Sequence, residues 1–407
     1  MDYKDTVNYL FSRLPMYQRD GKSAYKKNLS NIYTLLEKLD DPHKKFKSVH
    51  IAGTNGKGTC AHATAAILQL AGYKTGLYTS PHLKSFTERI KINGRKINES
   101  FVVDFVSEVK DTIEKTDPSF FEITVAMAFE YFARQKVDIA VIETGLGGRL
   151  DSTNVIIPEA CLITNIGLDH MDMLGDTLEK IATEKAGIIK KGIPVVVGEY
   201  NEKAFPVFVN KAKAMRSRLI FDHDFGQKAS FPPLSYHKTK NSNSIFTLIK
   251  LLKELGLKIE DTHLNKGYLE LEKLTGLMGR SQVLSKKPYT IVDIAHNELG
   301  LDALFSSIKS KLQNGRLHLI FGTVKDKDLK PIFKLFPKNS EYYWTEASVP
   351  RSLEVEKLSR LTKEQGLIGE SYKNVNDALN AARKRARPED TIVVTGSTFV
   401  VAELDEL

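Results

Sequence analysis

The segment that most constrains the fold of this chain is a glycine-rich loop, Gly-Thr-Asn-Gly-Lys-Gly-Thr, at residues 53–59. An apolar run, residues 49–52, precedes it, and an alanine-rich stretch of helical character follows it. A strand, a glycine turn, a lysine, a hydroxyl and a helix in this order form a cradle for phosphate. Glycines let backbone N–H groups face an anion, and the helix adds the positive end of its dipole. The pattern therefore predicts nucleotide binding.

Two side chains of the loop have specific expected roles. Lys57 can reach the β- and γ-phosphates, and the Thr59 hydroxyl can face phosphate or Mg²⁺. The other loop residues expected at the nucleotide are Thr54, Asn55, Gly56 and Gly58. The loop is not a standard Walker A motif, because two residues instead of four separate Gly53 from the Gly-Lys pair. A lone glycine loop is often a plain turn, but the flanking strand and helix favour the nucleotide site.

Chain length and composition set the broad class. With 407 residues the chain exceeds what one core usually fills, so two domains are expected. Its 42% hydrophobic and 27% charged residues are typical of a globular protein, and no apolar run is long enough to span a bilayer. The N-terminus lacks the pattern of a secretory signal. Cys60 and Cys161 cannot build a disulfide framework, which favours a reducing cytoplasm.

The charge balance is basic: 59 Lys and Arg against 50 Asp and Glu give a net charge of +9. The basic residues are scattered among acidic ones, which serves solubility or attracts small polyanions such as ATP and carboxylates. No nucleic-acid-binding module is recognisable. We therefore expect small-molecule partners, no nucleic acid and no membrane, and a monomer.

Apolar strand-like runs alternate with helical stretches along the chain, which predicts parallel α/β sheets covered on both faces. The expected strands of the first part are residues 48–53, 75–78, 138–144, 160–167, 194–198 and 218–221, and its main helices are 59–72, 100–114, 121–134, 177–190 and 242–255. Residues 222–239 read as a loop. The rhythm restarts after Gly279-Arg280, with strands expected at 289–295, 317–321, 341–345 and 391–395 and helices at 299–312, 329–336, 353–364 and 375–386. This places one domain at 1–278 and a second at 279–407.

Polar groups follow several of the predicted strands at the expected carboxyl edge of the sheet. Glu143 ends a buried strand before a glycine-rich turn, which is where α/β nucleotide enzymes place a Mg²⁺ ligand. Asp169 and His170 follow the next strand, and Ser80 follows an earlier one. For Glu143 the alternative is a strand-end charge without a role. For Ser80 the choice between capping a turn and binding metal stays open.

Two further polar groups are ambiguous by themselves. Lys185 lies in the predicted helix 177–190, where a lysine normally faces solvent. Asp293, His296 and Asn297 follow a strand of the second block, which places them where groups could reach across an interdomain cleft.

Together these segments resemble the folylpolyglutamate synthase/dihydrofolate synthase family within the Mur ligase superfamily. The resemblance covers nearly the whole chain. It rests on residues 15–21, 53–59, 80–83, 86–90, 120–124, 143–151, 167–170, 184–187, 279–280, 293–297, 350–351 and 395–397. It implies a P-loop parallel-sheet domain followed by a smaller Rossmann-like α/β domain, with ATP between them and domain closure before reaction.

The resemblance also implies residue roles. Ser80, Glu143 and His170 would bind Mg²⁺, with two ions in all, and Lys185 would be carbamylated to support the second ion. Asn241, Arg280 and Asp293 would contact the nucleotide. Phe121, Glu122 and Ser152 would hold the pterin-bearing substrate. His296 and Ser397 would complete the catalytic and substrate groups of the second domain.

The sequence departs from the family pattern at four positions. Family members usually have Asn, Gln, Gly and Pro where this chain has Thr87, Lys238, Ile294 and Glu298. The first two departures put local substrate and adenine contacts in doubt.

The implied reaction is ATP-dependent amide formation. A substrate carboxylate attacks the γ-phosphate to give an acyl phosphate, and the amine of L-glutamate then displaces phosphate, which needs positioning and charge neutralisation more than a protein nucleophile. The alternatives are a cell-wall Mur ligase and a nucleotide switch without ligase activity. The first normally carries a substantial domain before the phosphate loop, where this chain has 52 residues that read as two helices. The second leaves His170, Lys185 and the second domain without a role.

Overall fold

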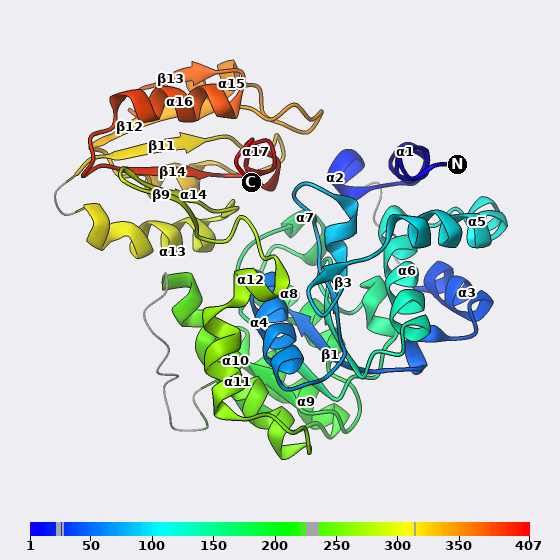
Figure 1. The fold of residues 1–407 in the computed structure, drawn as a ribbon. Helices are drawn as coiled ribbons and strands as arrows, with labels where there is room; N and C mark the ends of the chain where they lie inside the picture. Colours follow the sequence, from blue (N-terminus) through cyan, green and yellow to red (C-terminus); the bar gives the residue numbers. More distant parts are fainter. Residues whose placement is uncertain (22–25, 27, 223, 225–235, 313–314) are drawn as a thin grey trace. The chain divides into compact units, whose positions relative to one another are not determined.

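The structure is a computed structural model, and it describes residues 1–21, 26, 28–222, 224, 236–312 and 315–407 (Figure 1). The chain forms two compact units: the first ends at Leu277, the second begins at Met278, and residues 236–238 at the start of α10 (Tyr236–Glu254) are grouped with the second. Each unit has its own sheet.

The first unit is built on an eight-stranded sheet in the order β4-β3-β2-β5-β1-β6-β7-β8. The strands are β1 (Lys47–Ala52), β2 (Thr75–Tyr78), β3 (Ile90–Ile92), β4 (Arg95–Lys96), β5 (Ile139–Glu143), β6 (Ala160–Ile163), β7 (Val195–Val197) and β8 (Leu219–Phe221). The neighbouring strands β2, β5, β1, β6, β7 and β8 pair in parallel. At one edge, β3 pairs antiparallel with β2 and with β4. β1, which carries the glycine loop, lies between β5 and β6.

Helices make up much of the rest of the first unit. They are α1 (Tyr3–Arg13), α2 (Tyr17–Asp20), α3 (Ser30–Lys38), α4 (Lys57–Leu70), α5 (Glu99–Thr116), α6 (Phe120–Arg134), α7 (Met171–Leu174), α8 (Leu178–Lys185), α9 (Phe205–Met215), α10 (Tyr236–Glu254), α11 (Asp261–Leu269) and α12 (Leu271–Thr275). Short 3-10 turns are η2 (Pro42–Lys44), η3 (Phe86–Arg89), η4 (Ser152–Val155) and η5 (Ala186–Ile188). α4 packs on β1, β2 and β5 and is joined by α11 and α12 (Figure 1).

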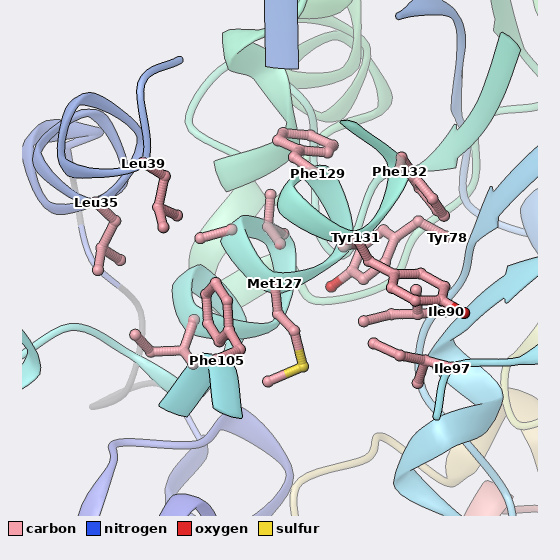
Figure 2. Packing of buried hydrophobic residues seen from close by; sticks show 14 of the residues in the cluster. Leu35, Leu39, Tyr78, Ile90, Ile97, Phe105, Met127, Phe129, Tyr131 and Phe132 are labelled. Carbon is pink, nitrogen blue, oxygen red and sulfur yellow. The ribbon is translucent and has the colours of Figure 1, made fainter. Parts of the chain in front are cut away.

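One apolar core of the first unit lies around α6. Aromatic and aliphatic side chains from α3, α5 and α6 meet those of β2 and β3 there (Figure 2). Alternate residues of β5, Ala140 and Ile142, belong to this cluster, as expected for a strand whose side chains point to opposite faces. α6 is buried along most of its length, and a capping box between Ser119 and Glu122 begins it.

The second unit has a six-stranded sheet in the order β13-β12-β11-β14-β10-β9. Its strands are β9 (Gln282–Lys286), β10 (Tyr289–Val292), β11 (Leu317–Phe321), β12 (Ser340–Thr345), β13 (Gly369–Tyr372) and β14 (Thr391–Thr395). Its helices are α13 (Glu298–Ile308), the 3-10 turn η6 (Lys309–Leu312), α14 (Lys330–Lys334), α15 (Val355–Lys363), α16 (Val375–Arg385) and α17 (Thr398–Ala402). Among the described strands of this sheet, β9 pairs antiparallel with β10 and the other pairings are parallel. The expected pair of α/β folds with mostly parallel sheets is confirmed.

The structure differs from the sequence expectations in several elements. The strands β3, β4, β9 and β13 were not expected, because each is short or lies at the edge of a sheet and carries little periodic signal. The helix α9, of eleven residues, was also missed. The presumed loop 222–239 is wrong at its end, since α10 begins at Tyr236, while residues 223 and 225–235 lie outside the described residues. None of the described helices has the length and apolarity that crossing a membrane requires.

Candidate active site

The strand order of the first unit brings four of the predicted polar loops to one edge of the sheet. β5 and β6 pair with β1 on either side, and β2 pairs with β5, all in parallel. Glu143 ends β5, and the loops after β2 and β6 contain Ser80 and His170, at the same edge as the glycine loop. Parallel strands end at the same edge, so the predicted convergence of these loops follows directly from the topology.

Two glycines of the loop are required by their surroundings. At Gly53 an added Cβ would lie 1.8 Å from the Thr164 hydroxyl oxygen, and φ is +151°. At Gly56, which precedes α4, φ is +83° and a Cβ would lie 2.3 Å from Asn241 Oδ1. The Asn241 side chain therefore packs directly on the glycine loop, in the place where the resemblance implies a nucleotide contact.

The segment after β6 braces the glycine loop. The Thr54 N–H donates to the Asn165 carbonyl at 3.0 Å, and the Asn55 N–H donates to Asn165 Oδ1 at 2.9 Å. The Thr164 hydroxyl donates to the Asn55 carbonyl at 2.6 Å, and the Gly167 N–H donates to Thr54 Oγ1 at 3.0 Å. Sequence reasoning missed Asn165; its only signal was its position directly after a strand, two residues beyond Ile163. Thr54 and Asn55 thus help to fix the shape of the loop.

Two lysine ammonium groups meet at the first glycine. Lys57 Nζ donates to the carbonyls of Gly53 and Thr54 at 3.0 and 3.1 Å, and Lys185 Nζ donates to the Gly53 carbonyl at 2.8 Å. Lys185 is only 3% exposed, so the helical pattern that favoured a solvent-facing lysine was misleading. Burial, and then the positive charge of Lys57, lower the pKa of Lys185 to about 7, although Asp169 and Asp151 oppose the shift.

The predicted metal ligands lie at the same edge. Glu143 is the last residue of β5 and is 2% exposed, and the Ser80 N–H donates to its Oε2 at 3.3 Å. The backbone of His170 is left-handed, with φ +50°, and its N–H donates to Asp169 Oδ1 at 2.9 Å. Among the described residues no group of three or more His, Cys, Asp or Glu side chains is placed to hold a metal. The carboxylate and the hydroxyl offer the oxygen ligands that Mg²⁺ prefers, water and phosphate oxygens would complete its shell, and the imidazole would add a nitrogen ligand.

The predicted substrate residues lie on α6 and η4. The Phe121 ring covers Gly145, where an added Cβ would meet Phe121 Cζ at 2.4 Å, and Ser152 is buried. The Glu122 carboxylate accepts hydrogen bonds from the Ser119 N–H and hydroxyl at 2.7 and 2.9 Å, and burial raises its pKa. Glu122 therefore has a capping role that the sequence analysis did not foresee, and its contact with substrate stays a prediction.

In the second unit, three of the four predicted residues gather at the ends of β10 and β14. The Asp293 carboxylate accepts from the N–H groups of Ser281 and Ala295 at 2.7 and 2.8 Å. His296 Nδ1 lies 3.0 Å from the Ile294 carbonyl oxygen, and the Ser397 hydroxyl accepts from the Phe399 N–H at the start of α17. The Ala295 carbonyl accepts from Thr395 and Gly396, which ties the two strand ends together. The fourth, Arg280, follows Gly279, whose carbonyl accepts from the Ile294 N–H.

Three of the four departures from the family pattern can be placed in the structure. Thr87 is buried and its hydroxyl lies 2.8 Å from the Ser85 hydroxyl. Ile294 does not adopt a positive φ, so no glycine is required there, and Glu298 is the first residue of α13. The side chain of Lys238 lies outside the part of the chain whose side chains are described.

A parallel sheet with a glycine phosphate loop, a lysine in that loop and a carboxylate on the neighbouring strand defines a P-loop α/β protein. Two family models match the sequence: the Mur ligase middle domain over residues 51–261 and the Mur ligase, glutamate ligase domain over residues 279–398. A dihydrofolate synthase/folylpolyglutamate synthase of Bacillus subtilis is 31% identical, over 99% of this chain and 98% of its own. The chain belongs to the dihydrofolate synthase/folylpolyglutamate synthase family of the Mur ligases.

Other members of this family are similar to nearly the whole chain. The folylpolyglutamate synthase of Lacticaseibacillus casei is 32% identical over 99% of this chain and 97% of its own. Among solved structures, Escherichia coli FolC in complex with DHPP and ADP has a TM-score of 0.86 at 28% identity and covers 99% of this chain and 96% of its own. A bifunctional folylpolyglutamate synthase/dihydrofolate synthase with Mn, AMPPNP and L-glutamate bound has a TM-score of 0.85 at 27% identity, over 99% of this chain and 97% of its own.

Proposed function

We propose that this chain is an ATP-dependent ligase that joins L-glutamate to dihydropteroate, to folates, or to both, and that it does so through an acyl phosphate. The substrate carboxylate attacks the γ-phosphate, ADP leaves, and the glutamate amine then attacks the acyl carbon and releases phosphate. The relatives support this substrate set, since their structures contain ADP or AMPPNP, DHPP and L-glutamate.

The observation that carries the proposal is the convergence of the glycine loop, Lys57 and Glu143 at one sheet edge. Lys57 Nζ rests on loop carbonyls within its own turn, from which it can move to the β- and γ-phosphates with a change of side-chain torsions. The first N–H groups of α4 are not used in the hydrogen bonds of the helix itself and can donate to phosphate oxygens. In the second unit, Arg280 and Asp293 would act toward ATP, as would Asn241 of the first unit.

Ser80, Glu143 and His170 would hold Mg²⁺, and we expect two ions. A bound Mg²⁺ neutralises phosphate charge and orients the γ-phosphate for in-line attack. The protein itself contributes a carboxylate that is already desolvated at the end of β5 and fixed against the Ser80 backbone. Phe121, Glu122 and Ser152 would hold the pterin-bearing substrate, and His296 and Ser397 would act on the glutamate side.

Carbamylation of Lys185 is supported by its environment. With its pKa lowered to about 7, a large fraction of its amine is neutral at physiological pH. The neutral nitrogen attacks CO₂, an N–C bond forms and one proton is released, which leaves an anionic carbamate in place of a cation. We therefore expect Lys185→Ala to lose activity and short carboxylates to restore part of it. Full activity without added carboxylate would contradict this role.

The deciding experiment measures ADP release and products with dihydropteroate and tetrahydrofolate offered separately, each with and without L-glutamate. Glutamate-dependent ADP release with a glutamylated product is the expected result, and the substrate that reacts defines the activity. ATP hydrolysis that ignores glutamate and both pterins would favour a nucleotide switch. We also expect a monomer that acts on these small substrates. A reducing compartment such as the cytoplasm suits the two buried free thiols, Cys60 and Cys161.

A further inference from the structure

A guanidinium group is buried beside the predicted metal and substrate residues. Arg89 ends η3, directly before β3, and is 2% exposed. Its Nε donates to His82 Nδ1 at 2.8 Å, and its Cζ lies 5.1 Å from the centre of the Phe120 ring. Burial lowers the pKa of Arg89, while the nearby Tyr78, Glu88 and Glu143 oppose this shift. An arginine remains charged even so, and its desolvation is therefore a cost that nearby partners must offset.

The hydrogen bond from Arg89 also determines the tautomer of His82. A guanidinium has only donors, so His82 Nδ1 must be the acceptor and its proton must sit on Nε2. His82 follows Ser80 by two residues. The Arg89 side chain thereby sets the tautomer and orientation of a residue in the same turn as a predicted metal ligand.

The rest of this turn is also tied to η3. The Thr79 N–H donates to the Arg89 carbonyl at 3.0 Å. The Glu88 carboxylate accepts from three consecutive N–H groups, those of Leu83, Lys84 and Ser85, at 2.8, 3.1 and 2.8 Å. We call residues 79–85 the Ser80 loop. η3 thus holds both ends of the Ser80 loop, and the Arg89 side chain holds its middle.

On its other side Arg89 touches the start of α6. Phe120 is the first residue of α6 and precedes Phe121, a predicted pterin contact. The Phe120 ring stacks on Phe11 at 5.1 Å between centroids and meets the edge of Phe86 at 5.9 Å. The Phe120 N–H donates to the Pro15 carbonyl at 3.0 Å. A cation over this ring links the aromatic cluster to the Ser80 loop.

We propose that Arg89 is a positioning residue for the ligase reaction, which couples the geometry of the Ser80 loop to that of the first turn of α6. One side chain would thus align a metal–phosphate element with a substrate-binding element. This inference rests on the proposed function. A buried charge is weak evidence for a purely stabilising role, because the cost of removing it from water offsets much of what its contacts gain.

The test compares Arg89→Met and Arg89→Lys with a control, Arg95→Met, at an exposed arginine of β4. ¹⁵N-histidine NMR, with the His82 signal assigned through His82→Gln, reports the tautomer. Electron paramagnetic resonance of Mn²⁺ measures Mn²⁺ affinity in the presence of AMPPNP. Steady-state kinetics gives the KM for dihydropteroate. Thermal unfolding monitors the fold.

We expect Arg89→Met to lose the fixed tautomer, to weaken Mn²⁺ binding by about tenfold or more, and to raise KM for dihydropteroate. Arg89→Lys keeps the charge, but an ammonium group is not a planar group that can donate to His82 and lie over Phe120 at once. Its Mn²⁺ affinity and KM should therefore lie between those of the wild type and Arg89→Met. Arg95→Met should match the wild type.

Wild-type Mn²⁺ affinity and KM in a folded Arg89→Met protein would overturn the proposal, even if its melting temperature fell. If Arg89→Met does not fold, Arg89→Lys decides by the same two values. Failure of the proposed function is distinguishable, because the wild type itself would then show no glutamate-dependent ADP release.

Discussion

Lys57 and Lys185 donate to the same acceptor, the carbonyl oxygen of Gly53, at 3.0 and 2.8 Å. Two ammonium groups on one neutral oxygen repel each other, which is part of the reason for the low pKa of Lys185. A phosphate group in the loop would attract Lys57, and carbamylation would turn Lys185 into an anion. Either event relieves the repulsion, so this pair of lysines favours both of the states that the proposed reaction requires.

Removal of the Lys57 ammonium should stop turnover and preserve the fold. Its hydrogen bonds to Gly53 and Thr54 are made within a partly exposed loop. We expect Lys57→Ala to lower kcat by at least about a hundredfold, in line with the loss of a charge-stabilising donor. Circular dichroism checks the fold, and Lys38→Ala, at an exposed lysine of α3, is the control. Normal turnover in Lys57→Ala would contradict the proposed contact of Lys57 with the ATP phosphates.

Neutralising Glu143 should weaken metal binding specifically. Glu143→Gln keeps the size of the side chain and an oxygen for the Ser80 N–H, but it removes the negative charge. The Mg²⁺ concentration for half-maximal activity should rise by about tenfold or more, and the Mn²⁺ affinity with AMPPNP should fall by a similar factor. The melting temperature should change little. Unchanged values for both metals would show that Glu143 is only a strand-end charge.

Replacing Lys185 should change how stability depends on pH. Its folded pKa, about 7, lies below the ordinary value of 10.5, so between these values the unfolded chain binds more protons. Wild-type stability therefore gains from this lysine as pH rises from about 7 toward 10.5. In Lys185→Met that gain is absent. The stability of Lys185→Met relative to wild type should be lowest near pH 10, rise as pH falls to 7, and level off below it.

Urea unfolding of Lys185→Met and wild type across pH 6–10, in CO₂-free buffer, measures this difference. A constant difference across the range would mean that Lys185 keeps an ordinary pKa in the folded protein.

An alanine at Gly56 should damage the loop by collision as well as by strain. A non-glycine residue at φ +83° costs about 1–2 kcal/mol, and the Cβ would also meet Asn241 Oδ1 at 2.3 Å. Gly72 is a matched control, because its φ is +90° with nothing within 4 Å of an added Cβ. Gly56→Ala should lose more stability and more AMPPNP affinity than Gly72→Ala. Equal losses in both variants would show that the contact with Asn241 is unimportant.

The buried Thr275 hydroxyl should contribute measurably to the free energy of unfolding, because its loss leaves a buried polar group without one hydrogen-bond partner. The Thr275 hydroxyl donates to the Leu271 carbonyl at 2.7 Å, so it must accept from His62 Nδ1, also at 2.7 Å. Thr275→Val keeps the shape but leaves the Nδ1–H group without this partner. We expect a loss of about 1–3 kcal/mol in the free energy of unfolding, while Thr275→Ser keeps most of it. Denaturant titration measures both, and a neutral Thr275→Val would mean that water or another group replaces the hydroxyl.

The elements that the sequence predicted best are those with a strong local signal. The strands 75–78, 317–321 and 391–395 have the predicted bounds, because each is a short apolar run between helical segments. Helix 177–190 was predicted too long. α8 ends at Lys185, where the Arg149 N–H reaches the Glu184 carbonyl at 2.7 Å and Gly187 lies against the Arg149 backbone, so a contact distant in sequence decides its end.

The sequence by itself determined the phosphate loop, the alternation of strands and helices, and hence the sheet edge that carries Ser80, Glu143 and His170, because these follow from the order of residues along the chain. Only the tertiary structure decided that Lys185 is buried, that Asn165 braces the loop and that Arg89 lies between His82 and Phe120. Burial and the pairing of polar groups depend on segments 7 to 132 residues apart, and local periodicity carries no information about those contacts.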